Sequence, residues 1–220
     1  MNLLLFGPPG CGKGTQSARI TRWLNIPAIS TGEMLREEVA AKSDLGREIT
    51  SILSAGGLVN DDLVNRILTH RIMKEDCKSG FLLDGYPRTV SQARFLEGFL
   101  DSAGIPQPLV LHLDVPLGAL KRRIAARRQC PKCGKIYNLL KDPPLKKNKC
   151  NEDGELLDRR RDDHPNVVSS RLEAYKGWTH PVLEHYRKGN YHRVDGNLTP
   201  NEVYAQVEAV LDGQMVRVRR

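Results

Sequence analysis

One stretch constrains this chain more than any other: Gly7-Pro8-Pro9-Gly10-Cys11-Gly12-Lys13-Gly14-Thr15. It follows an apolar run, Leu3–Phe6, and precedes a predicted helix at 16–24. A glycine-rich turn between a strand and a helix lets backbone N–H groups point into one concavity, and the helix N-terminus adds partial positive charge. Lys13 then lies where its ammonium reaches the outer phosphates of a nucleotide. The stretch predicts a nucleotide phosphate site; the alternative is a glycine-rich turn that binds nothing.

One position departs from the common form of this motif. The pattern usually ends in Lys-Ser/Thr with the hydroxyl on Mg²⁺, whereas here Gly14 follows Lys13 and Thr15 comes one residue later. Mg²⁺ gives up its waters reluctantly. We therefore expect a Mg²⁺ ion that keeps most of its waters and is held mainly by the substrate phosphates.

Composition narrows the class of protein. The 220 residues suffice for one sizeable core with small insertions, and no apolar run is long enough to span a bilayer. Met1 leads directly into the first strand and leaves no room for a signal peptide, so we expect a cytoplasmic protein. The net charge of +8 suits a polyanionic partner, and five cysteines in such a protein argue against a disulfide scaffold.

Strand and helix patterns alternate along the chain. Apolar runs at 81–83 and 109–115 are typical of buried parallel strands, and a short strand is expected at 191–194. Capping patterns predict helix starts at Ser30, Asn60 and Thr89. Further helices are expected over 45–53, 167–175 and 202–211. The alternation predicts an α/β fold with a parallel sheet.

Asp84 ends the buried run at 81–83. Open α/β sheets place their ligands at the carboxyl ends of the strands. An Asp there commonly serves a magnesium ion, directly or through water; the alternative is an Asp that caps a turn.

Residues 129–157 break the alternating pattern, and this insertion carries paired metal-binding residues. Cys130 and Cys133 have the spacing of a metal knuckle, and Cys150 and Asp153 repeat it. Two such pairs predict a tetrahedral structural zinc site, with Asp153 as an oxygen ligand that zinc accepts less often than Cys. The alternatives are a metal-free loop with incidental thiols and, less favoured, a catalytic zinc.

Several motifs, taken together, resemble those of one family. They are Gly7-Pro8-Pro9-Gly10-Cys11-Gly12-Lys13-Gly14-Thr15-Gln16, Ser30-Thr31-Gly32-Glu33-Met34-Leu35-Arg36, Asp84-Gly85-Tyr86-Pro87-Arg88 and Arg160-Arg161-Asp162-Asp163. In order and spacing they closely resemble adenylate kinase motifs over nearly the whole chain. The insertion resembles the long, zinc-bearing lid of some bacterial members.

The resemblance implies a P-loop nucleoside monophosphate kinase fold with a parallel five-stranded core sheet flanked by helices. It divides the chain into a core (1–29, 60–126 and 164–220), an AMP-binding domain (30–59) and a lid (127–163). It also implies reversible transfer of the γ-phosphoryl group of Mg·ATP to AMP, giving two ADP. We expect a monomer with no nucleic-acid or membrane partner.

The resemblance also implies roles for individual residues. Those expected at ATP are Gly10, Cys11, Gly12, Lys13, Gly14, Thr15, Arg127, Tyr137 and Asn197. Those expected at AMP are Thr31, Arg36, Val59, Gly85, Arg88, Gln92, Arg160 and Arg171. Those expected around the transferred phosphoryl group are Arg123, Arg127, Arg160 and Arg171, with Asp84 holding magnesium waters.

Three positions stand apart within the resemblance. Gln92 has a competing explanation, because the capping pattern with Thr89 also accounts for it. Tyr86, where Phe is frequent in the family, and the pair His164-Pro165 depart from the family pattern.

Two other functions compete with this interpretation. The nearest is a kinase for UMP, CMP or GMP; pyrimidine kinases usually carry Ala at the position of Thr31 and have short lids, so both features favour AMP. A nucleotide-gated nucleic-acid binder belongs to a different class and needs aromatic residues beside the basic ones. Because Tyr137 is the only aromatic residue of the insertion, we rank the nucleic-acid binder below the kinase.

Lys13→Met tests the phosphate-loop assignment. We expect the fold to persist and turnover to fall at least about a hundredfold, because an electrostatic donor of this kind contributes roughly 3–4 kcal/mol. Circular dichroism checks the fold and a coupled assay of ADP formation measures the rate. A Lys13→Met protein with near wild-type turnover contradicts the assignment.

Overall fold

The computed structural model describes residues 1–40, 47, 49–50 and 59–218. Most of the helix expected over 45–53, and much of the AMP-binding domain expected over 30–59, lie outside the described residues. Within the described part, five parallel strands form one sheet in the order β2-β3-β1-β4-β7. Their bounds are β1 Asn2–Phe6, β2 Ala28–Ser30, β3 Phe81–Asp84, β4 Leu109–Asp114 and β7 Tyr191–Asp195. The predicted parallel α/β fold is confirmed.

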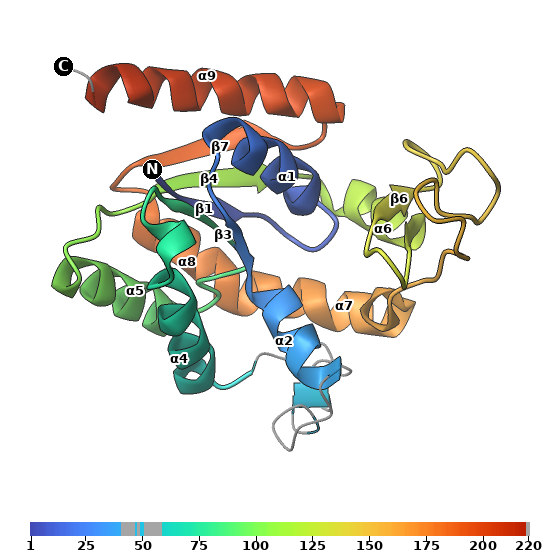
Figure 1. Cartoon of the computed structure of the whole chain (residues 1–220), viewed down its shortest axis with the longest axis horizontal. Helices are drawn as coiled ribbons and strands as arrows, with labels where there is room; N and C mark the ends of the chain where they lie inside the picture. The colour runs from blue at the N-terminus through green and yellow to red at the C-terminus, as the bar shows by residue number, and fades with distance from the viewer. Residues whose placement is uncertain (41–46, 48, 51–58, 219–220) are drawn as a thin grey trace.

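Helices connect the strands and cover both faces of the sheet (Figure 1). Their bounds are α1 Lys13–Leu24, α2 Thr31–Ala40, α4 Asp61–Ile72, α5 Val90–Ser102, α6 Leu117–Ala125, α7 Pro165–Ala174, α8 His180–Tyr186 and α9 Pro200–Val218. Short 3₁₀ turns occupy Glu75–Cys77 (η1) and Arg161–Asp163 (η2), and a π-helical turn, Tyr175–Thr179 (η3), joins α7 to α8. Within the described chain, no helix is both long and apolar enough to cross a membrane.

The alternation of side chains along β1 divides the core in two. Leu3 and Leu5 belong to the layer beneath α1, α6 and α9, whereas Leu4 and Phe6 belong to the layer beneath α4, α5 and α8. Successive residues of a strand point to opposite faces, so a run that is apolar throughout is buried on both sides. Figure 1 shows α9 and α1 on one side of the sheet and α4, α5 and α8 on the other.

The predicted capping residues begin their helices. The Glu33 N–H donates to Ser30 Oγ at 3.3 Å, and the Asp62 N–H donates to Asn60 Oδ1 at 2.8 Å. His164 and Pro165 open α7, with the proline in the first turn, where its missing N–H costs nothing. The last helix, α9, is longer than the expected 202–211. The expected range covered only the part with an amphipathic pattern, and the helix continues beyond that part.

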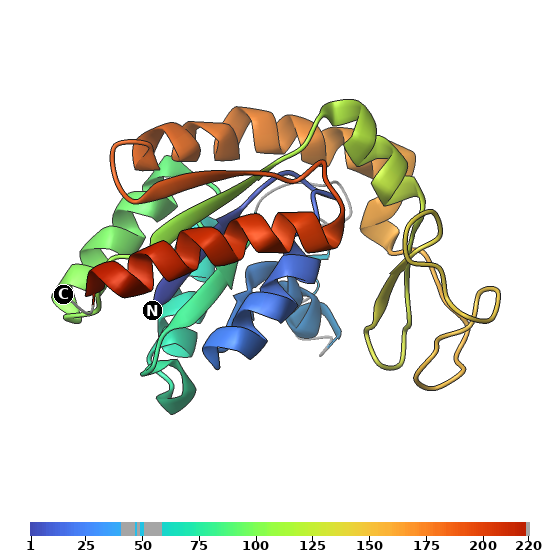
Figure 2. The same ribbon diagram turned by 90° about the horizontal axis from the view of Figure 1, so that it is seen from above.

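The insertion projects away from the sheet as a separate arm (Figure 2). Its only regular strands in the described chain are β5 (Arg127–Gln129) and β6 (Ile136–Asn138), which pair antiparallel. The arm leaves the core after α6 and returns to it at η2. The lid boundaries expected at 127–163 stay a prediction.

Gly80, directly before β3, offers a test of how the chain packs where this strand begins. Its φ is +122°, and a Cβ added there would lie 2.2 Å from the Met1 carbonyl oxygen and 2.5 Å from the Met1 nitrogen. We expect Gly80→Ala to destabilise the fold by more than about 1 kcal/mol, because both the backbone angle and the space oppose a side chain. Thermal unfolding measures the change.

Gly98 supplies the matched control for this substitution. It lies inside α5, and nothing is within 4 Å of an added Cβ. Gly98→Ala should stabilise the protein by up to about 1 kcal/mol through helix propensity. A Gly80→Ala protein that melts with the wild type would contradict the packing described for Met1 and Gly80.

Candidate active site

A cavity of about 360 Å³ opens at the carboxyl ends of the central strands. The glycine-rich loop, the start of α2, the end of β3, the arm and α7 all contribute to its wall. Its lining is rich in cations that come from distant parts of the sequence: Lys13, Arg36, Arg88, Arg123, Arg127, Lys141, Arg160 and Arg171. Such a lining fits a polyanionic ligand.

The glycine-rich loop forms the floor of this cavity. Gly10 has φ +80°, and a Cβ there would lie 2.5 Å from Ile124 Cγ1, so only glycine lets the loop pack against α6. Lys13 begins α1 and donates from Nζ to the carbonyl oxygens of Gly7 at 2.7 Å and Pro8 at 3.3 Å. These two bonds hold the ammonium over the loop, at the position expected from the sequence motif.

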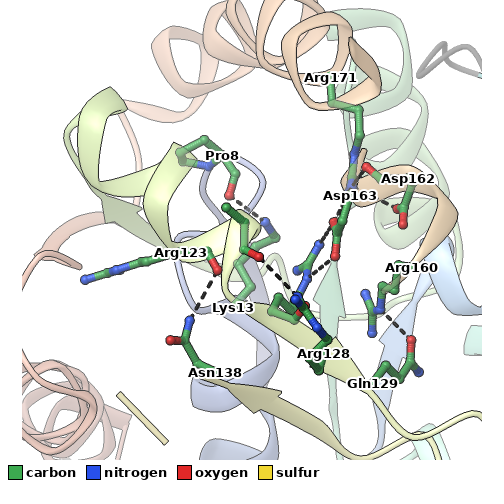
Figure 3. Close-up of polar contacts among 12 residues, drawn as sticks. Pro8, Lys13, Arg123, Arg128, Gln129, Asn138, Arg160, Asp162, Asp163 and Arg171 are labelled. Carbon is green, nitrogen blue, oxygen red and sulfur yellow. Dashed lines mark hydrogen bonds and ion pairs between the residues drawn. The ribbon is translucent and has the colours of Figure 1, made fainter. Parts of the chain in front are cut away.

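Asp163 holds two of the arginines in place. Its carboxylate, which is fully buried, accepts from Arg127 Nε at 2.7 Å and from a second nitrogen of the same guanidinium. Arg171 Nη1 lies 3.5 Å from the same carboxylate and 2.8 Å from Asp162 Oδ2. Arg160 Nε donates to Gln129 Oε1 at 2.5 Å. Figure 3 shows Arg160 and Arg171 approaching one region from the arm and from α7.

The charges of this cluster are not balanced within the cavity. Burial and the neighbouring Arg171 lower the pKa of Arg88 to about 10, and burial together with Arg127 lowers the pKa of Arg160 to about 10. Burial also raises the pKa of Asp84, against the pull of Lys13 and Arg88. Burial makes the charged form of these guanidiniums less stable than it is in water. An anionic ligand between them would stabilise the charged form.

Arg123 is not brought into this cluster. Its guanidinium donates to the carbonyl oxygens of Cys11 at 3.2 Å, Gly196 at 2.8 Å and Asn197 at 3.2 Å. In Figure 3 its side chain points away from the group around Asp163. Arg123 therefore lies between the glycine-rich loop and the loop after β7, at one side of the cavity.

Arg36 and Arg88 converge above Gly32. A Cβ added to Gly32 would lie 3.3 Å from Arg36 Nη1 and 3.8 Å from Arg88 Nη2. Arg88 Nε is fixed by the Gly85 carbonyl oxygen at 2.7 Å, which also accepts from the Thr31 hydroxyl at 2.9 Å. Gly85 itself has φ +81°, so the turn after β3 favours glycine. This pair of guanidiniums forms a second anion site beside the first.

Gln92 is engaged within the protein. Its Nε2 donates to Asp61 Oδ1 at 2.6 Å, and its Oε1 accepts from the Arg88 N–H at 2.7 Å. The Gln92 N–H donates to Thr89 Oγ1, so the helix cap is also present. Val59 is buried in the core nearby. The helix-capping interpretation of Gln92 therefore accounts for its contacts with one difference. The side-chain oxygen accepts from the Arg88 N–H, whereas a capping box would have it accept from the Thr89 N–H.

Tyr137 and Asn197 also have partners within the protein. Tyr137, 2% exposed, accepts from the Asn151 N–H at 2.7 Å and lies 3.3 Å from Cys150 Sγ, inside the arm. Asn197 is exposed, and its main-chain oxygen is the atom that meets Arg123.

Several residues of the site carry no recognisable sequence signal. Asp61 joins α4 to α5 through Thr89 and Gln92, and the Tyr86 hydroxyl donates to Asn65 Oδ1 at 2.5 Å. The polar partner on Asn65 accounts for a tyrosine where the family often has Phe. Gln16 lines the cavity with its Oε1 buried and unpaired among the described residues. Gln16 belongs to the glycine-rich motif. The contacts of Asp61 with α5 and of Asn65 with Tyr86 depend on the fold and have no local sequence pattern.

The expected metal ligands come together in the arm. One ligand atom from each of Cys130, Cys133, Cys150 and Asp153 lies within 4.8 Å of all the others. Two turns of the same form present them: the Gly134 N–H donates to Cys130 O at 3.0 Å, and the Gly154 N–H donates to Cys150 O at 3.0 Å. This set of three thiols and one carboxylate, in two matching knuckles, fits tetrahedral zinc.

Comparison with known proteins agrees with this geometry. The adenylate kinase family model matches residues 5–191. The chain belongs to the adenylate kinase family. It is 47% identical over 208 residues to an adenylate kinase of Thermosipho africanus, covering 94% of this chain and 97% of the relative. An adenylate kinase of Bacillus licheniformis is 44% identical over 215 residues, covering 97% and 99%, and one of Shouchella clausii is 43% identical over 212 residues, covering 96% and 98%.

Adenylate kinases are ATP:AMP phosphotransferases, so the chain is an enzyme of the nucleoside monophosphate kinase type. The cluster of arginines at a cavity floored by a glycine-rich loop is the chemistry that such a transfer needs. Family membership confirms the resemblance, the fold and the class of reaction. The roles expected of individual residues stay predictions.

We expect the metal of this adenylate kinase arm to be structural. The buried apolar part of the arm is small: Cys130, Tyr137 and Cys150, with Leu157 against them. A ligand that binds only the folded state stabilises it by about 2.7 kcal/mol at a hundredfold excess over its dissociation constant. Chelation should lower the melting temperature and leave considerable turnover in the cold.

Metal content, melting temperature and cold turnover should be measured on one chelated sample. Asp153→Cys should keep the metal and Cys150→Ser should weaken it, whereas Cys77→Ser, a thiol outside the arm, should leave the metal content unchanged. Loss of turnover in a chelated protein whose arm is still folded would show that the metal takes part in the chemistry.

Proposed function

We propose that this chain transfers the γ-phosphoryl group of Mg·ATP to AMP, reversibly, by direct in-line displacement between two anion sites. The supporting observation is the arrangement of cations in one cavity: Lys13 over the glycine-rich loop, the pair Arg36 and Arg88 above Gly32, and Arg127 and Arg171 on the shared carboxylate of Asp163. Since these cations line the same cavity, the phosphates of the donor and of the acceptor would share it.

The donor occupies the side of the glycine-rich loop. Residues 10–15 bind its phosphates through main-chain N–H groups, and Lys13 follows the charge of the transferring group. Arg123 is held by the carbonyl oxygens of Cys11 and Asn197, on the flank of the loop. Because Arg123 lines the same cavity as Arg127, Arg160 and Arg171, we keep the expected role for it, a contact with the phosphoryl group in transfer. We assign Tyr137, which lines the cavity, and Asn197, which follows Gly196 of its lining, to the donor side as well.

The acceptor occupies the side of α2 and β3. Arg36 and Arg88 bind the phosphate of AMP, because planar guanidiniums match phosphate oxygens in pairs. The base lies toward Thr31, Val59, Gly85 and Gln92. The Thr31 hydroxyl already donates its hydrogen to Gly85 O, so toward a base it offers only acceptor lone pairs. An acceptor suits the amino group of adenine and disfavours the oxo groups of uracil and guanine.

Transfer needs positioning and charge neutralisation more than proton chemistry. A phosphate oxygen of AMP is already ionised near neutrality, so no general base is required. Arg127 donates two N–H groups to Asp163, and its other N–H groups can donate to the phosphoryl group. Arg160 and Arg171 approach the same region (Figure 3). Bound with ATP, Mg²⁺ supplies further positive charge at the phosphates. Asp84, which lines the cavity near Lys13, is the residue that would hold its waters.

The two moving parts follow from the same division. Residues 30–59 form the AMP-binding domain, and 127–163 form a zinc-bearing lid that excludes water when both substrates are present. The remaining residues form the core. We propose a monomer, since each of these parts is present in one chain.

A panel of acceptors tests this function. In a coupled assay with Mg·ATP, the wild type should use AMP in preference to UMP, CMP and GMP. Thr31→Val removes the acceptor while keeping the shape, and should narrow the AMP-to-UMP ratio by about tenfold, the effect of one hydrogen bond.

Thr31→Ser keeps the hydroxyl and is the matched control, which should retain the wild-type preference. An unchanged ratio in Thr31→Val would move base recognition to Gln92 or the main chain. No phosphotransfer to any monophosphate by the wild type would refute the proposed function itself.

A further inference from the structure

A buried polar chain connects the active-site cavity to the middle of the sheet. His112, on β4, is 9% exposed and lies on the same face as Val110, beneath α8. Its Nε2 is 3.3 Å from the Tyr175 hydroxyl, and its Nδ1 is 2.7 Å from the Tyr191 hydroxyl on β7. Tyr175 in turn lines the cavity. His112 therefore joins a sheet strand to a helix residue at the wall of the site.

Tyr175 begins the π-helical turn between α7 and α8 (Figure 1). A π turn adds a residue to one helical turn and is often found at functional sites. Its other end, Thr179, donates its hydroxyl to the carbonyl oxygen of Arg88 at 3.2 Å. The turn is thus attached at Tyr175 to the sheet and at Thr179 to a residue of the acceptor site.

Arg171 lies one helical turn before Tyr175, and residues four apart share a helix face. Both line the cavity. Arg171 also contacts Asp162 and Asp163. Because α7 is regular from Pro165 to Ala174 and leads directly into the π turn, a shift of Tyr175 along the cavity would shift Arg171 with it.

We propose that His112 is a positioning residue for phosphoryl transfer: through its bond to the Tyr175 hydroxyl it fixes the π turn, and with it the Arg171 guanidinium. The inference rests on the proposed function, in which Arg171 binds the phosphoryl group.

A neutral imidazole suits this position. Burial lowers the pKa of His112 to about 4, so the ring is uncharged near neutrality, with one nitrogen donating and the other accepting. Each tyrosine hydroxyl can both donate and accept. Either tautomer therefore satisfies both bonds, and no proton needs to be taken up to hold the helix.

The two ring nitrogens allow a discriminating experiment. His112→Gln places its amide nitrogen near the position of Nε2, and His112→Asn places its amide near Nδ1. Steady-state kinetics with Mg·ATP and AMP should show kcat reduced about tenfold to a hundredfold in His112→Asn, since small misplacements of a reacting geometry cost this much. His112→Gln should restore most of it.

Tyr175→Phe removes only the hydroxyl and should lower kcat to the extent that His112→Asn does. The double variant should fall no further than either single one, because both remove the same bond. Tyr186→Phe is the matched control: this buried hydroxyl on α8 has no hydrogen-bond partner among the described residues, and its removal should leave kcat unchanged.

Arg171→Ala, measured alongside, separates the two levels of the argument. If Arg171→Ala loses turnover while His112→Asn keeps wild-type kcat, the positioning role is wrong and the proposed function stands. Equal losses in His112→Gln and His112→Asn, tracking a lowered melting temperature, would also overturn it, since a purely structural histidine does not distinguish its two nitrogens. If Arg171→Ala turns over like the wild type, the role given to Arg171 fails and the inference with it.

Discussion

Repulsion between buried cations is the constraint on which this structure depends. Arginines from α2, the turn after β3, the arm and α7 line one cavity. Among the described residues, the acidic groups near them are fewer than the cations: Glu33, Asp84, Asp142, Asp162 and Asp163. Burial tends to raise the pKa of Asp162, but the arginines around it outweigh burial and lower that pKa. Asp163 contacts two guanidiniums, those of Arg127 and Arg171, and Asp162 contacts Arg171 as well. The excess positive charge of the cavity is left for the substrates. An enzyme that must bind two phosphorylated nucleotides in one cavity gains from such an imbalance.

The parallel sheet makes this gathering possible. The glycine-rich loop follows β1, the Asp84 turn follows β3, and the loop that meets Arg123 follows β7, so these chain segments reach one edge from different places in the sequence. Glycine at two points keeps the approach close: Gly10 against Ile124, and Gly85 between Thr31 and Arg88. Strand order therefore brings these segments together, and most of the cations come from the loops and helices that follow the strands.

Local signals predicted much of this from the sequence, and long-range pairing limited the rest. The loop, the helix caps and the metal knuckles are each encoded within a few residues, and the structure has all of them. Arg123 shows the limit: it is one helical turn from Arg127, which suggests a shared face, yet α6 ends at Ala125 and the chain turns into β5. The two guanidiniums consequently face different partners. Gln92 shows the same limit, since its bond to Asp61 depends on how α4 packs on α5.

The end of α6 connects the arm to Arg123 and Arg127. The last carbonyl groups of a helix lack partners within it. Here the arm supplies them: Asn138 Nδ2 donates to Arg123 O at 3.2 Å, Leu139 N to Ala126 O at 2.9 Å, and Arg128 and Arg159 both donate to Ala125 O. Figure 3 shows the Asn138 contact beside Arg128.

Arg123 sits just before this junction and Arg127 just after it, so the fold of the arm and the aim of both guanidiniums depend on the same bonds. A metal that orders the arm can therefore affect turnover without touching a substrate. The metal would act through this junction by changing the fraction of time in which the arginines are correctly placed. The chemistry of phosphoryl transfer would be the same with or without the metal.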